Sequence, residues 1–421
     1  MPKTWVVTLD SVDSFCMHLT SYIQACKHAV VLRSHQITSP VFEGRYELLA
    51  GVHALQTCVA HSKQEVAQWV DQIETQKLFA MGYIAYEAGE HVPQTKAHGA
   101  LAQWIVPEYR LQIPTHSRQL TIIGPRPRDL YKQILACKPV SESIQPAVFT
   151  PLTSQNEYLN TVQKIQNDIL NGLYYELNYC IAFESRSVSA SPYAIWDVIA
   201  RKHPVPFSAF VKNNHEYLIS CSPERFLLKH QDKLISQPIK GTAPRGANPT
   251  EDQSHIRALA QDPKERAENI MIVDLVRNDL CRICKTGSVQ VEELLQVYTY
   301  PLVHQMVSTV SGLLLPQKRL SSILEATFPM GSMTGAPKKM VISKINEYEN
   351  VSRGPYSGSI GYLDGDTHFD LNVVIRTLVL NTLTQTASYH VGSAITLDSD
   401  PSKEYEECLL KAAFWKTLFS P

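Results

Sequence analysis

The chain has 421 residues, of which 44% are hydrophobic and 19% are charged. Such a composition can bury a large core and excludes an intrinsically disordered protein. The 39 Lys and Arg residues nearly cancel the 40 Asp and Glu residues, so no overall field would draw the protein to nucleic acid or to an anionic membrane. An acidic small molecule would have to be held by a few well-placed cations.

The N-terminal stretch is a poor secretory signal, because Asp10 and Asp13 interrupt its apolar run. No uncharged apolar run reaches the length of a transmembrane helix. The nine cysteines are scattered without the spacing of a disulfide framework, as expected for reduced thiols in a cytoplasmic protein. The CxxC of Cys281 and Cys284 has no second ligand pair nearby, so idle thiols are favoured over a zinc or redox site.

The first part of the chain, to about residue 110, alternates short β-type runs with helical stretches such as Lys63–Gln76. Six prolines then interrupt residues 112–151, which predicts an irregular connector. We therefore place a domain boundary there, between an N-terminal domain of residues 1–147 and a larger domain of residues 148–421.

The second part begins with a predicted helix over Asn156–Asn171 that ends at Gly172, a residue suited to a left-handed C-cap. Apolar β-type runs follow, among them RFLLKH, SIGYLD and DLNVVIRTLVL, and two strong helices are predicted at about 263–280 and 401–419. Strands and helices do not alternate regularly. The pattern predicts an α+β fold with large mixed or antiparallel β-sheets and flanking helices.

The first of the two strong helices carries a start signal with carboxylates beside it. Asp262 is a predicted N-cap, Pro263 takes the first helical position, and Glu265 completes a capping box that by itself explains this glutamate. Glu268 lies about a turn further on, where capping does not reach. An exposed carboxylate is the ordinary interpretation of Glu268.

The C-terminal helix repeats this arrangement, with Asp400 and Pro401 at its start. Glu404, Glu407 and Lys411 then fall on one face. A solvated face is the usual outcome of such a pattern. Alternatively, these carboxylates meet those of the first helix and form an oxygen-ligand magnesium site.

The segment QPIKGTAPRG places Lys240 between an apolar residue and Gly241, where backbone can approach a ligand closely. An exposed charge is the commonest fate of a lysine. If Lys240 is buried, its preference for the charged form falls and it becomes a candidate nucleophile. Neither a phosphate-binding P-loop motif nor a GxGxxG motif occurs in the sequence, which disfavours nucleotide binding.

Taken in order, these segments resemble the chorismate-utilising enzymes, a family that includes anthranilate synthase component I, aminodeoxychorismate synthase component I, and isochorismate and salicylate synthases. The resemblance is strong over residues 150–415 and fainter in the earlier segment GYIAYEAG. It implies the chorismate-binding fold of anthranilate synthase component I. The lysine of PIKGT resembles the aminodeoxychorismate synthases, since alanine is typical of anthranilate synthase at that place.

This resemblance implies amination of chorismate at C4 to 4-amino-4-deoxychorismate, on the route to 4-aminobenzoate and folate. Lys240 would attack C2, and we expect burial and nearby cations such as Arg376 to lower its pKa. Glu224 in SPERF matches the general acid, although pairing with Arg225 is the ordinary explanation of this glutamate. The resemblance also implies Mg2+ ligands, with Glu268 and Glu407 binding directly and Glu265 and Glu404 through water.

The remaining site residues implied by the resemblance contact the substrate. Arg376, Tyr362 and Lys411 would hold its carboxylates, and Gly241, Thr242, Gly392 and Ser393 would line its pocket with backbone. A surface salt bridge is the alternative for Arg376, but an arginine within an apolar strand has more need of a buried anion.

Two residues depart from the family pattern, in which histidine often stands at the position of Gln305 and glycine at the position of Ala394. Gln305 can form hydrogen bonds to substrate but cannot act as an acid. No glutamine amidotransferase motif is found, so ammonia would come from solution or from a glutamine amidotransferase partner. The alternatives are anthranilate synthase component I and a catalytically idle chorismate-binding regulatory paralogue.

Overall fold

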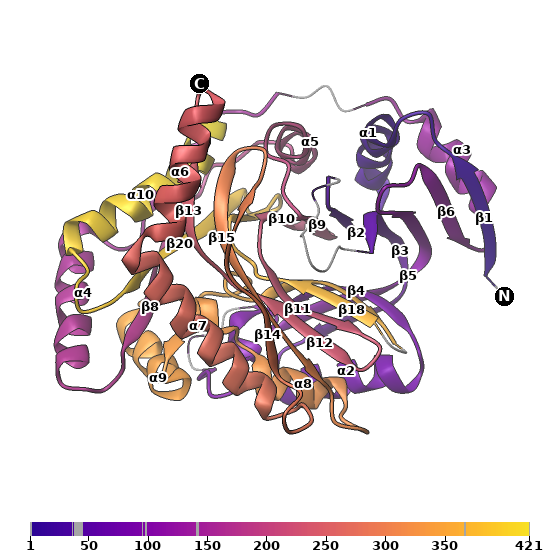
Figure 1. Cartoon of the computed structure of the whole chain (residues 1–421). Coiled ribbons are helices and arrows are strands. Elements are labelled where there is room, and N and C mark those ends of the chain that lie inside the picture. Colours follow the sequence, from indigo (N-terminus) through magenta and orange to yellow (C-terminus); the bar gives the residue numbers. More distant parts are fainter. Residues whose placement is uncertain are drawn as a thin grey trace.

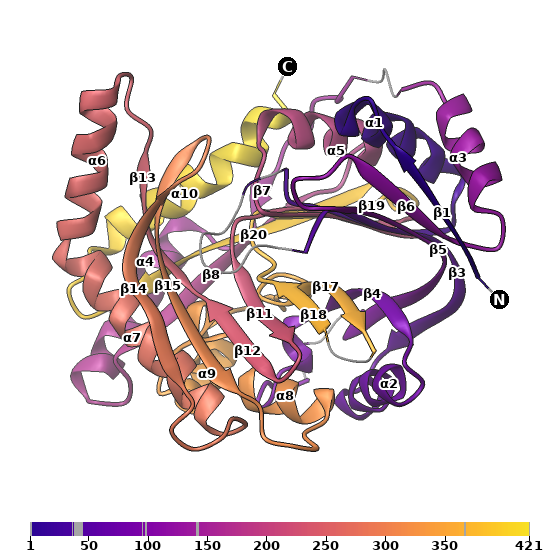
Figure 2. The same cartoon turned by 45° about the vertical axis from the view of Figure 1, so that its right-hand side comes forward.

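A computed structural model describes residues 2–35, 37, 45–94, 96, 99–139, 143–365 and 368–420. Its strands form two facing layers, with helices on the outer faces (Figures 1 and 2). Every pairing recorded among the described strands is antiparallel. The predicted α+β fold with flanking helices is therefore confirmed.

The first layer begins at the N-terminal strand and runs across the molecule. Its order is β1 (Lys3–Thr8), β6 (Gln119–Gly124), β5 (Ala102–Pro114), β3 (Tyr46–Ala60), β2 (His28–Arg33), β9 (Phe207–Asn213), β10 (Glu216–Ser222), β19 (Thr377–Asn381), β20 (Thr386–Ile395) and β8 (Glu176–Ser185). The short strands β7 (Thr150–Pro151) and β16 (Gly335–Ala336) pair with the free edge of β8.

The second layer starts from the same strand β5. Its order is β5, β4 (Phe79–Ile84), β17 (Ser359–Asp364), β18 (His368–Asn372), β11 (Arg225–His230), β12 (Lys233–Gln237) and β15 (Val303–Leu313). Strands β13 (Ile239–Pro244) and β14 (Gln290–Thr299) also pair with β15. Strand β5 thus belongs to both layers, pairing with β6 through residues 110–112 and with β4 through residues 102–105.

The helices divide between the two outer faces. The first layer is covered by α1 (Val12–Tyr22), α3 (Pro127–Ala136), α4 (Gln155–Leu170), α5 (Pro192–Lys202), α9 (Lys338–Tyr348) and α10 (Pro401–Leu418). The second layer is covered by α2 (Lys63–Thr75), α7 (Pro263–Cys281) and α8 (Leu320–Thr327), and α6 (Pro249–Gln261) lies against β13. A smaller apolar cluster between the layers joins them.

The predicted helix boundaries agree closely with the structure. Asp262 caps α7 by accepting a hydrogen bond from the backbone N–H of Glu265, and Asp400 caps α10. Helix α4 ends before Gly172, whose φ of 74° is the left-handed conformation expected there. The capping residues determine where these helices begin and end, because they form hydrogen bonds with backbone groups that have no partner within the helix.

Two predictions were wrong. Much of the expected connector over 112–151 is ordered, since it contains the end of β5, strand β6 and helix α3, with residues 140–142 outside the described residues. Pro114 ends β5 and Pro127 begins α3, which are positions where proline is tolerated. The run DLNVVIRTLVL is two strands, β18 and β19, separated by a bend in which Arg376 has a φ of 49°. Arg376 therefore does not lie within an apolar strand.

The division at residues 147 and 148 stays a prediction. Strands from the two predicted domains pair with one another, β2 with β9 and β4 with β17. The second domain's strands thereby extend both layers begun by the first.

One buried arginine joins segments that are distant from one another in the chain. Arg353 donates two hydrogen bonds to the Glu349 carboxylate, and others to the backbone oxygens of Asn178 and Met333 and to the hydroxyl of Ser357. Removing one partner of a buried ion pair leaves the other charge uncompensated.

We therefore expect Arg353→Leu to lower the free energy of unfolding by roughly 3–5 kcal/mol. The shift of the midpoint in urea denaturation measures this loss. The control is Arg186→Leu, which removes an exposed ion pair with Glu184 and should change the free energy by less than about 1 kcal/mol. Equal shifts for the two variants would contradict this account.

Candidate active site

The lysine singled out by the sequence lies on β13 at the point where this strand passes helix α7. Gly241 beside it has a φ of 90°, and a Cβ atom there would lie 3.0 Å from Leu259 and 3.1 Å from the Glu265 carboxylate. A side chain at position 241 would thus be strained and crowded. This glycine lets β13 approach α7 closely enough for Lys240 to meet Glu268.

Lys240 is mostly buried between two carboxylates. Its Nζ donates a hydrogen bond of 3.1 Å to Oε1 of Glu176 and lies 3.9 Å from Oε2 of Glu268. Burial alone would lower the pKa of Lys240, but the two carboxylates outweigh it and the pKa is raised. The expected lowering of this pKa was wrong, because the sequence analysis counted burial and distant cations and missed Glu176.

Glu176 is the functional candidate that sequence analysis missed. It stands in β8 opposite Ala336 of β16, and its side chain is almost fully buried. Its Oε2 has no hydrogen-bond partner among the described residues. The available signal was a carboxylate inside the apolar run of β8, since a buried carboxylate needs a partner.

Glu224, between β10 and β11, has the properties that a general acid needs. It is 4% exposed, and burial raises its pKa to about 7 against the opposing effects of a hydrogen bond from Ser332 and the charge of Lys240. A protonated fraction therefore persists near neutral pH. Arg225, the alternative partner considered for Glu224, forms a bidentate ion pair with Asp370.

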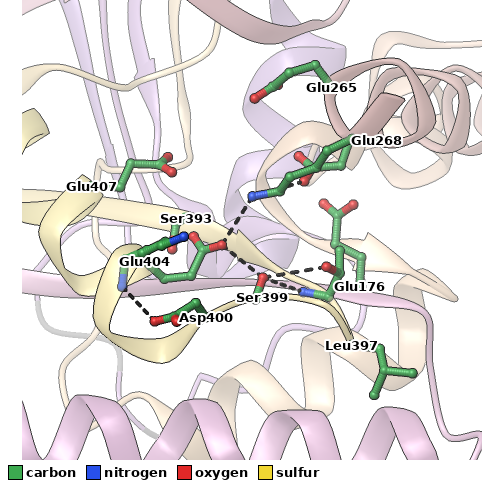
Figure 3. A network of polar contacts seen from close by, with 12 residues as sticks. Glu176, Glu265, Glu268, Ser393, Leu397, Ser399, Asp400, Glu404 and Glu407 are labelled. Atoms are coloured by element: carbon green, nitrogen blue, oxygen red, sulfur yellow. Dashed lines mark hydrogen bonds and ion pairs between the residues drawn. The ribbon is translucent and has the colours of Figure 1, made fainter. Parts of the chain in front are cut away.

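Helices α7 and α10 bring four glutamates toward one region, with Glu265 and Glu268 on one side and Glu404 and Glu407 on the other (Figure 3). Lys264 links the two helices, since its Nζ lies 3.2 Å from Oε1 of Glu404 and 3.8 Å from Oε1 of Glu268. The sequence spacing left open whether these carboxylates form a solvated face or meet, and it gave no indication of Lys264 between them.

The electrostatics of the four glutamates differ. Burial raises the pKa of Glu268 to about 7 and also raises that of Glu265. For Glu407, burial is outweighed by the ammonium of Lys411 at 2.7 Å, and the pKa is lowered. The predicted capping box is only half formed, because the Asp262 carboxylate caps the helix while the Asp262 N–H bonds to Leu259. The Glu265 side chain is thereby free to face Gly241.

The donors around these helices suit a hard divalent cation. Oε1 of Glu268, Oε2 of Glu404 and Oε2 of Glu176 are buried oxygens with no hydrogen-bond partner among the described residues. Within the same part of the chain, no three His, Cys, Asp or Glu side chains lie close enough together to hold one ion. An all-oxygen set that offers one or two carboxylates at a time fits magnesium, which keeps several waters and binds ligand anions.

The other predicted substrate contacts lie on four elements, β13, β15, β20 and α10. Thr242 pairs with Gln305 of β15, whose buried Oε1 lacks a partner among the described residues, while His304 next to it bonds to Asp252. Lys411 donates a hydrogen bond of 2.8 Å to the carbonyl of Gly392. The hydroxyl of Ser393 lies 3.0 Å from that of Tyr158, so this side chain faces the core rather than an open pocket.

Tyr362 and Arg376 are not brought to this cluster by any recorded contact. Tyr362 lines a separate cavity of about 60 Å3 between the two strand layers, together with Tyr46 and Phe207, and its hydroxyl has no partner among the described residues. Arg376 is exposed at its bend, and its charge acts on Cys221 and His203. No ion pair of Arg376 is found in the described part of the chain.

Other sequence predictions concerned cysteines and membrane segments. All nine cysteines are free thiols, and in the CxxC pair Cys281 is exposed whereas Cys284 is buried. Among the described residues, no helix has the length and apolar character needed to cross a membrane.

The chain belongs to the family of chorismate binding enzymes, whose match covers residues 27–417. It is 41% identical over 303 residues to the chloroplastic aminodeoxychorismate synthase of Arabidopsis thaliana, a match covering 70% of this chain and 32% of that protein. It is 39% identical over 255 residues to aminodeoxychorismate synthase component 1 of Klebsiella aerogenes, covering 60% of this chain and 56% of that protein. The matched part thus spans less than two thirds of either relative.

Solved structures support the fold. Anthranilate synthase component I from Streptococcus pneumoniae TIGR4 superimposes with a TM-score of 0.77 at 24% sequence identity, covering 92% of this chain and 94% of that one. At this identity the likeness establishes the two-layer architecture and its helices.

The raised pKa of Glu224 has a consequence for stability. The folded chain holds a proton on Glu224 that the unfolded chain releases near pH 4.5, so ionisation of Glu224 opposes folding as the pH rises to about 7. We expect the wild type to lose stability relative to Glu224→Gln over this range by up to roughly 3 kcal/mol. Urea unfolding of both proteins at pH 5 and pH 8 measures the difference, and a difference that does not change with pH would refute the raised pKa.

Proposed function

We propose that this protein aminates chorismate at C4 with ammonia and forms 4-amino-4-deoxychorismate, the precursor of 4-aminobenzoate and folate. The observation that carries the proposal is the buried Lys240 amine, placed against Glu176 and close to Glu268 in a chorismate binding enzyme. The names of the two aminodeoxychorismate synthases to which the chain is similar support the same reaction.

The first half of the proposed reaction joins the substrate to the protein. Lys240 Nζ passes a proton to Oε1 of Glu176, its hydrogen-bond partner, and the free amine attacks C2 of chorismate. The ring double bonds shift, the C4–O bond breaks, and Glu224 protonates the departing hydroxyl so that it leaves as water. Glu224 suits this step because its pKa of about 7 keeps part of it protonated.

In the second half, ammonia adds at C4 while the C2–N bond to Lys240 breaks, and the lysine leaves as a neutral amine. The new ammonium group gives one proton to the Glu224 carboxylate, which restores the acid, and Glu176 returns its proton to the amine of Lys240. The sum is chorismate plus ammonia giving 4-amino-4-deoxychorismate plus water. The two successive displacements, first by Lys240 at C2 and then by ammonia at C4, place the nitrogen of ammonia at C4 without a direct replacement of the hydroxyl there.

We also propose a magnesium requirement. Glu268 and Glu407 would bind the ion directly, and Glu265 and Glu404 would reach it through water. Bound there, magnesium would neutralise the ring carboxylate of the substrate. Lys411, which pairs with Glu407 and with the Gly392 carbonyl, would hold this edge of the pocket together.

The ammonia source is proposed to be a glutamine amidotransferase partner. The relative from Klebsiella aerogenes is named as component 1, which implies a further component there. No nucleophile-elbow cysteine with His and Glu partners was found in this sequence. The chain alone should therefore use ammonium and not glutamine.

The test is product analysis after incubation with chorismate, magnesium and ammonium. The wild type should form 4-amino-4-deoxychorismate with ammonium at high pH, and no amine with glutamine as the only nitrogen source. Lys240→Ala should lower the rate by roughly 1,000-fold or more, because it removes the nucleophile. When ammonia is withheld, intact-mass analysis should show a species heavier by chorismate less one water, mapped to Lys240.

The matched control is Lys233→Ala, which removes a lysine of β12 that is ion-paired to Glu292 of β14 and should leave the rate within about twofold. Formation of anthranilate instead would identify the alternative amination at C2. Wild-type rates in Lys240→Ala would overturn the covalent mechanism. Chorismate binding without any amine product would favour a regulatory chorismate-binding protein.

The magnesium requirement is tested by direct binding. We expect Glu268→Gln and Glu407→Gln each to weaken magnesium binding, measured by titration calorimetry with chorismate present, by roughly tenfold or more, because each removes a charged oxygen ligand. Glu406→Gln, an exposed neighbour on α10, is the control and should bind as the wild type does. Unchanged magnesium affinity in both site variants, or full turnover with excess chelator, would exclude this site.

A further inference from the structure

A small cavity lies directly against Glu224 and has no place in the reaction described above. Its walls come from the strands, from helix α7 and from the turn η3 (Gly331–Met333), and include Ser236, Pro238, Val276, Leu280, Met330 and Ser332. Every lining residue is buried. The cavity has a volume of about 20 Å3, which is enough for one molecule of the size of water.

Apart from Glu224, the charged groups that line this cavity are already compensated. Arg225 pairs with Asp370 and donates a further hydrogen bond to Gln237, and Asp279 pairs with Lys338. While Glu224 keeps its proton, an ion placed here would lose its hydration and gain no unpaired opposite charge, which disfavours it. The cavity therefore suits a neutral molecule rather than ammonium or another ion.

The cavity also contains the polar contacts that a small neutral guest needs. The Glu224 carboxyl faces it together with Ser332, whose hydroxyl bonds to that carboxyl. Pro238 on its wall lies two residues before Lys240 in the chain. A guest next to Glu224 would thus lie beside the group that acts on the leaving oxygen at C4.

We propose that this cavity is the holding site for neutral ammonia, the second reactant of the proposed amination, on which this inference rests. From here ammonia moves to C4 as the C2–N bond to Lys240 breaks. The Glu224 carboxylate accepts one proton from the new C4 ammonium group. Because the cavity admits one water-sized neutral molecule, it selects ammonia over ammonium and over larger amines.

The test fills the cavity from two of the elements that line it. Val276→Ile adds one methylene from α7, and Ser236→Thr adds one methyl group from β12, where threonine is well tolerated. Each should raise the KM for ammonia, measured with ammonium chloride at fixed pH, by roughly fivefold or more, and change the KM for chorismate by less than about twofold. Thermal unfolding checks that both variants remain folded, and either one carries the test if the other does not.

The matched control is Val273→Ile, which adds the same methylene to a buried valine one turn earlier on α7 that does not line the cavity. Its KM for ammonia should equal that of the wild type. An unchanged KM for ammonia in the folded cavity variants would show that the space holds only a structural water. Absence of any amine product from the wild type would instead overturn the proposed function, and the cavity proposal with it.

Discussion

The site depends on the compensation of charge around the buried side chains of Lys240 and Glu176. Lys240 is kept there by Glu176 and Glu268, and Lys264 holds Glu268 and Glu404 from the other side. A buried charge without a partner is costly, so none of these side chains can be removed without altering the protonation of the next. Two helices and two strands that are distant in sequence meet here because their charges need one another.

This mutual dependence explains why the lysine is charged although it is buried. Desolvation and two carboxylates act on it in opposite directions, and the carboxylates prevail. The same balance raises the pKa of Glu268, because that carboxyl loses more by burial than it gains from Lys240. Substrate and metal binding would therefore change several protonation states together, as expected for coupled groups.

Much of the architecture could be predicted because its signals are local. Caps and periodic apolar faces located α7 and α10, and lone runs such as SIGYLD located single strands. The bend at Arg376 could not be predicted, because an apolar run does not reveal a residue with positive φ inside it. The pKa of Lys240 could not be predicted either, since the deciding partner Glu176 is 64 residues away in the chain. The family resemblance indicated the expected roles of single residues, whereas only the structure shows which side chains they contact.

The strand shared by both layers, β5, limits how the molecule can admit a ligand. It hydrogen-bonds to β6 along one part and to β4 along another while pairing with β3 over nearly its whole length. A rotation of one layer away from the other would break backbone hydrogen bonds in the middle of β5. Hinges in proteins usually lie at loops or at the ends of elements, where no such bonds are broken. Entry to the site must therefore proceed by local rearrangement at helix ends and long side chains. Lys264 and Lys411, whose side chains are about half exposed, are charged groups at the site that can change position without breaking a strand pairing.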